Sequence, residues 1–316
     1  NEHNFLLDSE RTAQYTLSSN LTSAQIDQTS YAPTFTSTGF SLYNWASAND
    51  NNEDYVGWTF RKQPKFFDVV TYTGDGNAGR TVSHSLGTTV GMLIIKSTSN
   101  SSDWSVFHRS VGNDKYLAIN ETHSAQTDTT RFHSTTPSST TFTLGSGNAV
   151  NGSGRTYVAY LFAHNNSDGG FGPDSEDIIK CDKIDSTSDD TVNVTLGFEP
   201  QFIMIKKSSA SGDWQVFDNM RGMPHGTDDQ ILAWNTNDAE SNSNRIKINP
   251  DGFTASGFGT NTDYIYMAIR RPDMSTPTAA SEVFSIDTQG SSAPYFDSTH
   301  IVDMALVRPV GSGGSG

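Results

Sequence analysis

The sequence predicts an all-β protein made of three homologous antiparallel β-sandwich-like modules. Two observations lead to this prediction: a domain-sized internal repeat, and short alternating apolar runs separated by Gly, Ser, Thr, Asn and Asp. Alternating runs bounded by turn residues are typical of strands. An internal repeat of this length sets the architecture of the whole chain.

The repeat is clearest in a hairpin that occurs twice. LGTTVGMLIIKSTSNSSDWSVFHR begins at Leu86, and LGFEPQFIMIKKSSASGDWQVFDNMR begins at Leu196. In each copy an apolar run ends in lysine, a Ser-rich loop follows, and Asp-Trp opens a second alternating run. Two alternating runs joined by small polar residues predict a β-hairpin.

The same order of motifs continues through a complete module. KYLAIN at 115–120 is matched by QILAWN at 230–235, and RTYVAYLFA at 155–163 is matched by TDYIYMAIR at 262–270. We therefore expect module 1 over residues 64–165 and module 2 over residues 166–272. Short strands separated by turn signals predict a sandwich for each.

The two ends of the chain match the two halves of a third module. Residues 1–63 contain NFLLDSER, QYTLSSN and EDYVGWTFR, the back part, and residues 273–310 contain VFSIDTQG and HIVDMALVRPV, the front part. GSGGSG at 311–316 has the composition of a flexible linker and looks engineered. We expect one module split across the chain termini in a pseudo-threefold arrangement. The alternative is a fragment of a longer tandem array.

Composition limits the classes of function. The 316 residues carry a formal net charge of −15 and one cysteine, Cys181. This charge argues against a nucleic-acid surface, and no apolar segment approaches the roughly twenty residues that span a bilayer. A single cysteine excludes an internal disulfide, so we expect folding in a reducing cytosol even for a product that works outside the cell.

The letters of a dinucleotide-binding fingerprint, GxGxxG, occur at residues 74–79. The residues that follow, RTVSHSL, alternate like a strand and not like a helix. A pyrophosphate needs the helix N-terminus that this pattern lacks. The sequence therefore predicts a turn at this position.

No residue pattern predicts catalysis, a metal site or a cofactor. The histidines are not matched between copies, since His108 aligns with Asp218 and Asp8. No pair has the spacing of a zinc site, and the acidic runs at 49–54 and 188–190 lack the Gly and Glu positions of a calcium loop. We expect a protein that is not an enzyme and has no catalytic, metal-binding or cofactor-binding residues.

Positions shared between the copies are candidates for ligand contacts or for contacts between modules. Arginine follows the second hairpin strand in all three copies, and Asp-Trp opens this strand in two. An arginine can pair across a module boundary or bind an anionic sugar, and a tryptophan can be core or a platform for a sugar ring. Both interpretations stay open for these candidates, which are Arg11, Arg109, Arg221, Asp103, Trp104, Asp213 and Trp214.

Several phrases resemble the repeated modules of large virion-associated proteins from marine tailed bacteriophages, a family of unknown function. They include KFFDVVTYTGDG, GRTVSHSLG, DWSVFHRS, TYVAYLFAH and YIYMAIRRP, and the resemblance covers nearly the whole chain short of the linker. At the level of pattern only, the modules are similar to the H-type lectin-like tips of phage fibres, which trimerise. Neither resemblance carries catalytic residues over to this chain.

The resemblance implies a non-enzymatic virion or tail-fibre-like structural protein that presents a receptor-contacting surface, in the virion or outside the cell. The expected partners are other virion proteins or a host-surface glycan or receptor, without nucleic acid or membrane insertion, and self-association stays open. A stand-alone carbohydrate-binding, lectin-like module is the alternative. A glycan depolymerase, which needs two convergent carboxylates, is the third candidate.

Overall fold

A computed structural model of the protein describes residues 3–31, 33–42, 45–172, 175–185, 190–223 and 229–272, together with Ser291. The chain divides into two compact units, Asn1–Arg271 and Pro272–Gly316. Every element named below belongs to the first unit. Apart from Ser291, the expected front part of module 3 and the Gly/Ser linker lie outside the described residues.

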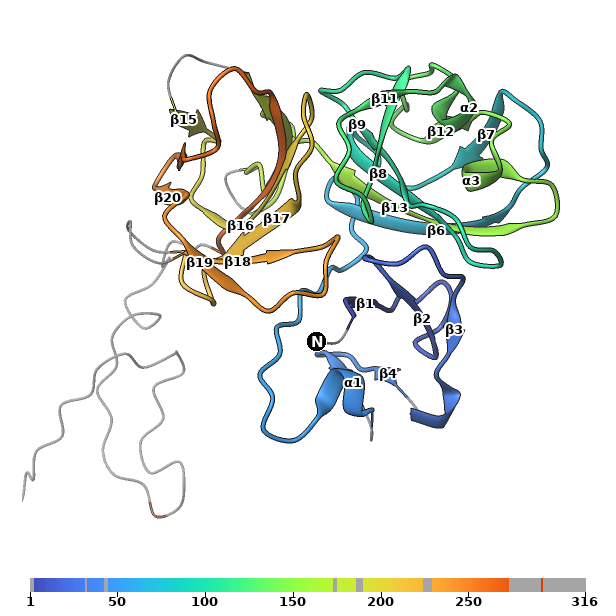
Figure 1. Cartoon of the computed structure of the whole chain (residues 1–316), viewed down its shortest axis with the longest axis horizontal. Coiled ribbons are helices and arrows are strands. Elements are labelled where there is room, and N and C mark those ends of the chain that lie inside the picture. The colour runs from blue at the N-terminus through green and yellow to red at the C-terminus, as the bar shows by residue number, and fades with distance from the viewer. Residues whose placement is uncertain are drawn as a thin grey trace, which may run out of the picture. The chain divides into compact units, whose positions relative to one another are not determined.

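The expected all-β class is confirmed. Nearly all regular elements are strands, and every pairing between described strands is antiparallel (Figure 1). The helices are single turns: η1 (Thr29–Tyr31), α1 (Ala46–Asn49), α2 (Thr129–Phe132) and α3 (Asn148–Asn151).

Residues 64–165 form a β-sandwich. The larger sheet has the strand order β11-β10-β9-β8-β13-β6, and β12 pairs with β7 in the smaller one. The rings of Tyr72 and Phe142, one from each sheet, lie 6.1 Å apart, so the sheets pack face to face. The strands are β6 (Phe67–Thr73), β7 (Arg80–Ser83), β8 (Val90–Ser97), β9 (Ser105–His108), β10 (Lys115–Ala118), β11 (Gln126–Thr127), β12 (Thr141–Leu144) and β13 (Thr156–Ala163).

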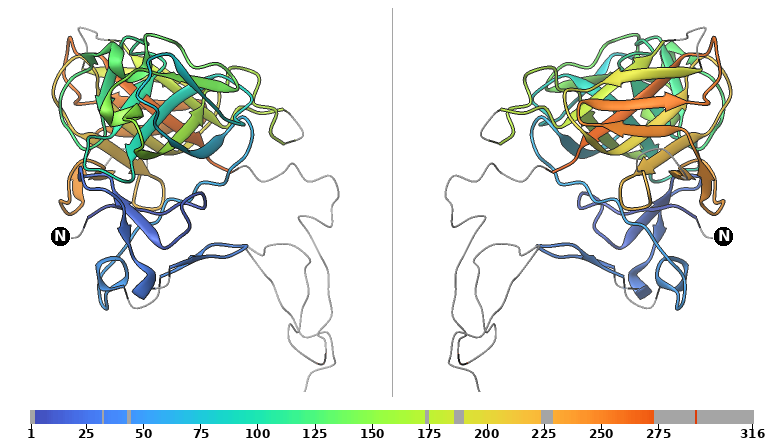
Figure 2. Two further views of the ribbon diagram at one scale, coloured as in Figure 1. Left: turned by 90° about the vertical axis from the view of Figure 1, so that its right-hand side faces the viewer. Right: turned by 90° about the vertical axis from the view of Figure 1, so that its left-hand side faces the viewer.

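Residues 166–272 form a second sandwich. Its larger sheet, β19-β18-β17-β16-β22-β14, has the strand order of the first when the two are aligned by position, and β15-β21-β20 form the smaller sheet. The right-hand view of Figure 2 shows the yellow and orange strands of this second sandwich. The strands are β14 (Ile179–Ile184), β15 (Thr191–Thr195), β16 (Pro200–Lys207), β17 (Trp214–Asp218), β18 (Asp229–Ala233), β19 (Ser241–Ser243), β20 (Ile246–Asn249), β21 (Gly252–Ser256) and β22 (Tyr264–Arg270).

The N-terminal segment forms two small sheets. One has the order β1-β2-β3, which by sequence position corresponds to β9-β10-β11, and β4 pairs with β5 in the other. Whether residues 273–310 complete a third module stays a prediction, because they lie outside the described residues. The strands are β1 (Phe5–Leu6), β2 (Tyr15–Ser18), β3 (Ile26–Asp27), β4 (Thr34–Phe35) and β5 (Phe40–Ser41).

The main hydrophobic core runs across both sandwiches, and Cys181 belongs to it as a buried residue. A Cβ atom added at Gly91 in β8 would lie 2.6 Å from Cys181 Cβ and 2.7 Å from the carbonyl oxygen of Ala163. Glycine is therefore required where β8 and β14 come together. The GxGxxG letters lie in the turn between β6 and β7, as the alternation predicts, and no helix begins there.

Candidate functional site

The shared tryptophans lie at boundaries between segments of the repeat. Trp104 and Trp214 are each 1% exposed. Trp104 Nε1 donates to the carbonyl oxygens of Ser18 (3.1 Å) and Leu21 (3.0 Å), and Trp214 Nε1 donates to that of Ala118 (2.8 Å). A buried indole N–H needs an acceptor, and a neighbouring segment supplies it in both cases. Side chains this deeply buried offer no face to a sugar ring.

Asn4 stands at the corresponding position of the N-terminal segment. Its Nδ2 donates to the carbonyl oxygens of Ala233 (3.3 Å), Trp234 (3.2 Å) and Thr236 (2.8 Å). The N-terminal segment thus contacts module 2, as module 2 contacts module 1 and module 1 contacts the N-terminal segment. Among the described residues these contacts form a closed cycle. Sequence reasoning missed Asn4 because no tryptophan marks the position.

The candidate aspartates hold the start of the same strand within their own module. Asn120 Nδ2 donates to Asp103 Oδ1 (3.0 Å), and Asn120 Oδ1 accepts from the backbone N–H of the following tryptophan (2.9 Å). Asn235 makes the same two hydrogen bonds, both 2.8 Å long, with Asp213 and its tryptophan. The shared asparagine therefore orients the Asp-Trp pair that joins the segments.

The lysine that ends the central strand of each sandwich also reaches into a neighbouring loop. Lys96 Nζ donates to the carbonyl oxygen of Thr22 (2.9 Å), and Lys206 Nζ donates to those of Thr122 and His123 (both 3.0 Å). Both lysines are buried, and burial lowers the pKa of each to about 8. An ammonium has three donors and no acceptor, so carbonyl oxygens suit it. These lysines were visible in the repeat, but their role as contacts was not.

Two of the three candidate arginines form buried ion pairs with an aspartate three residues earlier. Arg11 Nε lies 2.6 Å from Asp8 Oδ2, and Arg221 Nε lies 2.8 Å from Asp218 Oδ2. Tyr160 of β13 donates its hydroxyl to Asp8 (2.7 Å), and burial raises the pKa of that hydroxyl well above its usual range. Arg11 and Asp8 therefore stabilise a contact between the N-terminal segment and module 1.

Arg109 differs because His108 stands where the other copies have aspartate. Its Nη1 lies 3.4 Å from Asp182 Oδ1 in a partly exposed pair. His108 is buried, and its Nε2 lies 3.2 Å from the carbonyl oxygen of Tyr266 in module 2. The position is again a contact between modules, but a neutral ring replaces the carboxylate.

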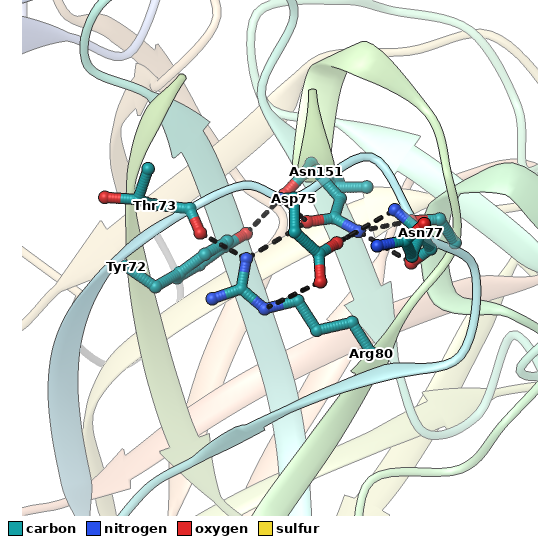
Figure 3. A network of polar contacts seen from close by, with 8 residues as sticks. Tyr72, Thr73, Asp75, Asn77, Arg80 and Asn151 are labelled. Atoms are coloured by element: carbon teal, nitrogen blue, oxygen red, sulfur yellow. Dashed lines mark hydrogen bonds and ion pairs between the residues drawn. The ribbon is translucent and has the colours of Figure 1, made fainter. Parts of the chain in front are cut away.

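A buried amide holds the loop at residues 74–79 (Figure 3). Asn151 Nδ2 donates to Asp75 Oδ1 (3.0 Å) and to the carbonyl oxygens of Asn77 (2.9 Å) and Gly145 (3.1 Å). Asn151 Oδ1 accepts from the backbone N–H of Asp75 (3.0 Å) and from Arg80 (3.3 Å). The amide has all of its hydrogen-bonding capacity in use. We assign this network to the fold.

A polar hollow of about 330 Å³ opens on module 1. The loop between β8 and β9, the helices α2 and α3, and the residue before β13 surround it. Asp128 caps α2 by accepting from Thr130 N (2.9 Å), and Arg131 Nε lies 3.2 Å from Asp128 Oδ2. The lining consists of Ser101, Ser102, Asp103, Asp128, Thr130, Arg131, Gly147, Asn148, Ala149 and Arg155.

A second hollow, of about 380 Å³, lies between the N-terminal segment and module 1 and includes Arg11. Of the candidates from the sequence, Asp103 and Arg11 thus border open space, one at each hollow. Among the residues that the structure describes, no group of three or more His, Cys, Asp and Glu side chains is placed to hold a metal ion. No helix in the described ranges is long and apolar enough to cross a membrane.

Comparison with known proteins gives a family and no characterised relative. Neither a curated protein nor a solved structure matches the chain. A protein-family model matches residues 1–271, from the N-terminal segment to the end of the second sandwich. The chain therefore belongs to the family described as a domain of unknown function, DUF7483.

Proposed function

We propose that the protein is a non-enzymatic virion or tail-fibre-like structural protein that presents a receptor-contacting surface. The observation that supports this most directly is the closed cycle of contacts among the N-terminal segment and the two sandwiches. Among the described residues, the tryptophans and lysines that the two sandwiches share donate hydrogen bonds that join these parts. A structural protein that carries load or displays a surface needs such fixed joints.

The chemistry of the joints supports the proposal. Trp104, Trp214, Asn4, Lys96 and Lys206 all donate to backbone carbonyl oxygens of a neighbouring segment. A carbonyl oxygen is present whatever side chain its residue carries, so repeated modules can diverge in sequence while the joint persists. Leaving such a buried donor or acceptor unpaired costs about 1–3 kcal/mol, which favours keeping every joint closed.

Immunogold labelling of purified phage particles tests the proposal. Antibodies raised against the chain should label intact particles at a defined position, and the chain should sediment with particles after nuclease treatment and washing. A chain found only in the soluble fraction of the lysate would contradict a structural role and would favour the stand-alone carbohydrate-binding module.

The polar hollow favours carbohydrate binding as the second candidate, and Asp128 at its rim does not suit the general acid of a depolymerase. Asp103 and Asp128 both border the hollow. Burial acts to raise the pKa of Asp128, but hydrogen bonds from Thr130 and Arg131 outweigh it and lower this pKa. A glycosidase needs one carboxyl with a raised pKa as general acid. If the purified chain released reducing ends from host polysaccharide, a depolymerase would replace carbohydrate binding as the second candidate.

A further inference from the structure

We infer that the hollow of module 1 binds a neutral sugar residue of the receptor through its hydroxyl groups, which Asp103 and Arg155 contact. The inference rests on the proposed receptor-contacting function and adds the site and the class of ligand. Three observations lead to it: a difference between the two sandwiches, unused hydrogen-bonding capacity, and the size and charge of the hollow.

The two sandwiches share the framework around this position. Gly145 N donates to the carbonyl oxygen of Arg131 (2.9 Å), and Ser256 N donates to that of Arg245 (2.8 Å). Each of these arginines also donates through Nη1 to the residue that directly follows the shared tryptophan. In module 1 the acceptor is Ser105 Oγ (2.7 Å), and in module 2 it is Gln215 Oε1 (3.2 Å). These bonds align the two modules residue by residue.

Two residues further along, the modules differ. Phe258 of module 2 is 9% exposed, and the guanidinium of Arg245 lies 5.3 Å from its ring centroid. Module 1 has Gly147 at the corresponding position, and a Cβ atom there would lie 2.8 Å from the carbonyl oxygen of Thr130. Module 1 therefore has no side chain at the position where module 2 carries an aromatic ring.

The hollow is bordered by polar groups that the protein leaves partly unused. Asp103 Oδ1 accepts from Asn120, whereas Asp103 Oδ2 has no hydrogen bond or ion pair within the described ranges. Among the residues that the structure describes, the Arg155 guanidinium makes a single hydrogen bond, 3.5 Å long, to the carbonyl oxygen of Asn148.

This combination matches the hydroxyl groups of a sugar. A carboxylate oxygen only accepts, a guanidinium only donates, and each sugar hydroxyl does both. Adjacent hydroxyl groups of one ring can therefore donate to Asp103 and accept from Arg155. The shared polar groups elsewhere, such as Asn120 and Lys206, already have protein partners.

Size and charge narrow the ligand. A volume of about 330 Å³ is at the lower end of the roughly 300–1,000 Å³ of small-molecule sites, which suits a short saccharide. Two arginines and two aspartates line the hollow, so their formal charges cancel, although the chain as a whole carries −15. A strongly anionic glycan would be repelled by the protein before it reached the hollow, and a neutral sugar would not.

The experiment uses the full chain and a printed array of bacterial surface polysaccharides and defined oligosaccharides. The best neutral binder is then titrated by calorimetry against three variants. Arg155→Ala removes a donor, Ala149→Trp fills the hollow, and Arg61→Ala, at an exposed arginine outside the hollow, is the matched control. We expect at least a tenfold weaker affinity for Arg155→Ala, loss of binding for Ala149→Trp, and no change for Arg61→Ala, at unchanged melting temperature.

Hydrogen exchange of the wild-type chain with and without the same glycan gives a readout that does not depend on variant stability. Amides of residues 101–103 and 147–149 should gain protection. Glycan binding that both hollow variants retain, or protection elsewhere, would overturn the site and leave the proposed function standing. A wild-type chain that binds no glycan on the array would overturn the inference as well, and labelling of particles would still decide the structural role.

Discussion

Acid should weaken the contact between the two sandwiches through His108. This side chain is 1% exposed, and its Nε2 lies 3.2 Å from the carbonyl oxygen of Tyr266. Burial lowers the pKa of His108 to about 4, from an ordinary value of 6.5. The folded protein therefore keeps the ring neutral at a pH where the unfolded chain already binds a proton.

The sign follows from this difference in proton uptake. Because the folded pKa is lowered, the contribution of the neutral ring to stability is fully present above about pH 6.5 and is lost as the pH falls from about 6.5 to about 4. The difference of about 2.5 pH units corresponds to at most about 3 kcal/mol of unfolding free energy, at about 1.36 kcal/mol per unit. Burial also lowers the pKa of His84 and His164, so some acid sensitivity should remain without His108.

Urea denaturation followed by tryptophan fluorescence at pH 7.5, 6 and 5 measures the effect. The wild-type unfolding free energy should fall steadily below pH 6.5, and His108→Gln, which keeps a donor for the Tyr266 carbonyl, should fall less steeply. His133→Asn is the control, because His133 is exposed with φ of 50°, a conformation that asparagine tolerates. Equal slopes for wild type and His108→Gln would refute the reasoning.

Three further changes test the contacts that hold the fold. Trp214→Phe removes the indole donor from the Ala118 carbonyl oxygen, which still accepts from Glu121 N at 3.3 Å, so the unfolding free energy should fall by about 0.5–1.5 kcal/mol; an unchanged denaturation midpoint would contradict this contact. Gly91→Ala places a methyl group 2.6 Å from Cys181 Cβ and should cost about 1–3 kcal/mol, whereas Gly39→Ala, with nothing within 4 Å, should leave the melting temperature unchanged. Asn151→Ala removes the amide that holds the loop at 74–79, and it should lower the unfolding free energy measured by urea denaturation by at least about 2 kcal/mol. A denaturation midpoint equal to that of the wild type would show that these hydrogen bonds do not stabilise the fold.

Some features of the protein follow from local sequence. Alternation of apolar and polar residues is a property of a few consecutive positions, and it predicted the all-β class and the hairpin of β8 and β9. The same local pattern identified residues 74–79 as a turn despite their fingerprint letters.

The sequence identified the shared positions without assigning their role. Trp104 and Arg11 recur in or near matching strands, and each was open to a ligand or to a neighbouring module. The choice depends on burial, which residues far away in the chain determine: Ser18 accepts from Trp104, and Tyr160 contacts Asp8 beside Arg11. Asn4 and His108 make corresponding contacts with different chemistry, so a search for identical residues does not find them.

By itself, the sequence determined the strand content, the turns and the repeated order of motifs, because periodicity and turn propensity act over a few residues. Only the tertiary structure decided which shared side chains join segments and where open space remains. The hollow of module 1 shows the reason. Four separate stretches of chain meet there, and Gly147 packs so closely against Thr130 of another element that a Cβ atom would lie 2.8 Å from the Thr130 carbonyl oxygen. Such a space belongs to the packing of distant segments and has no counterpart in the local pattern of any one of them.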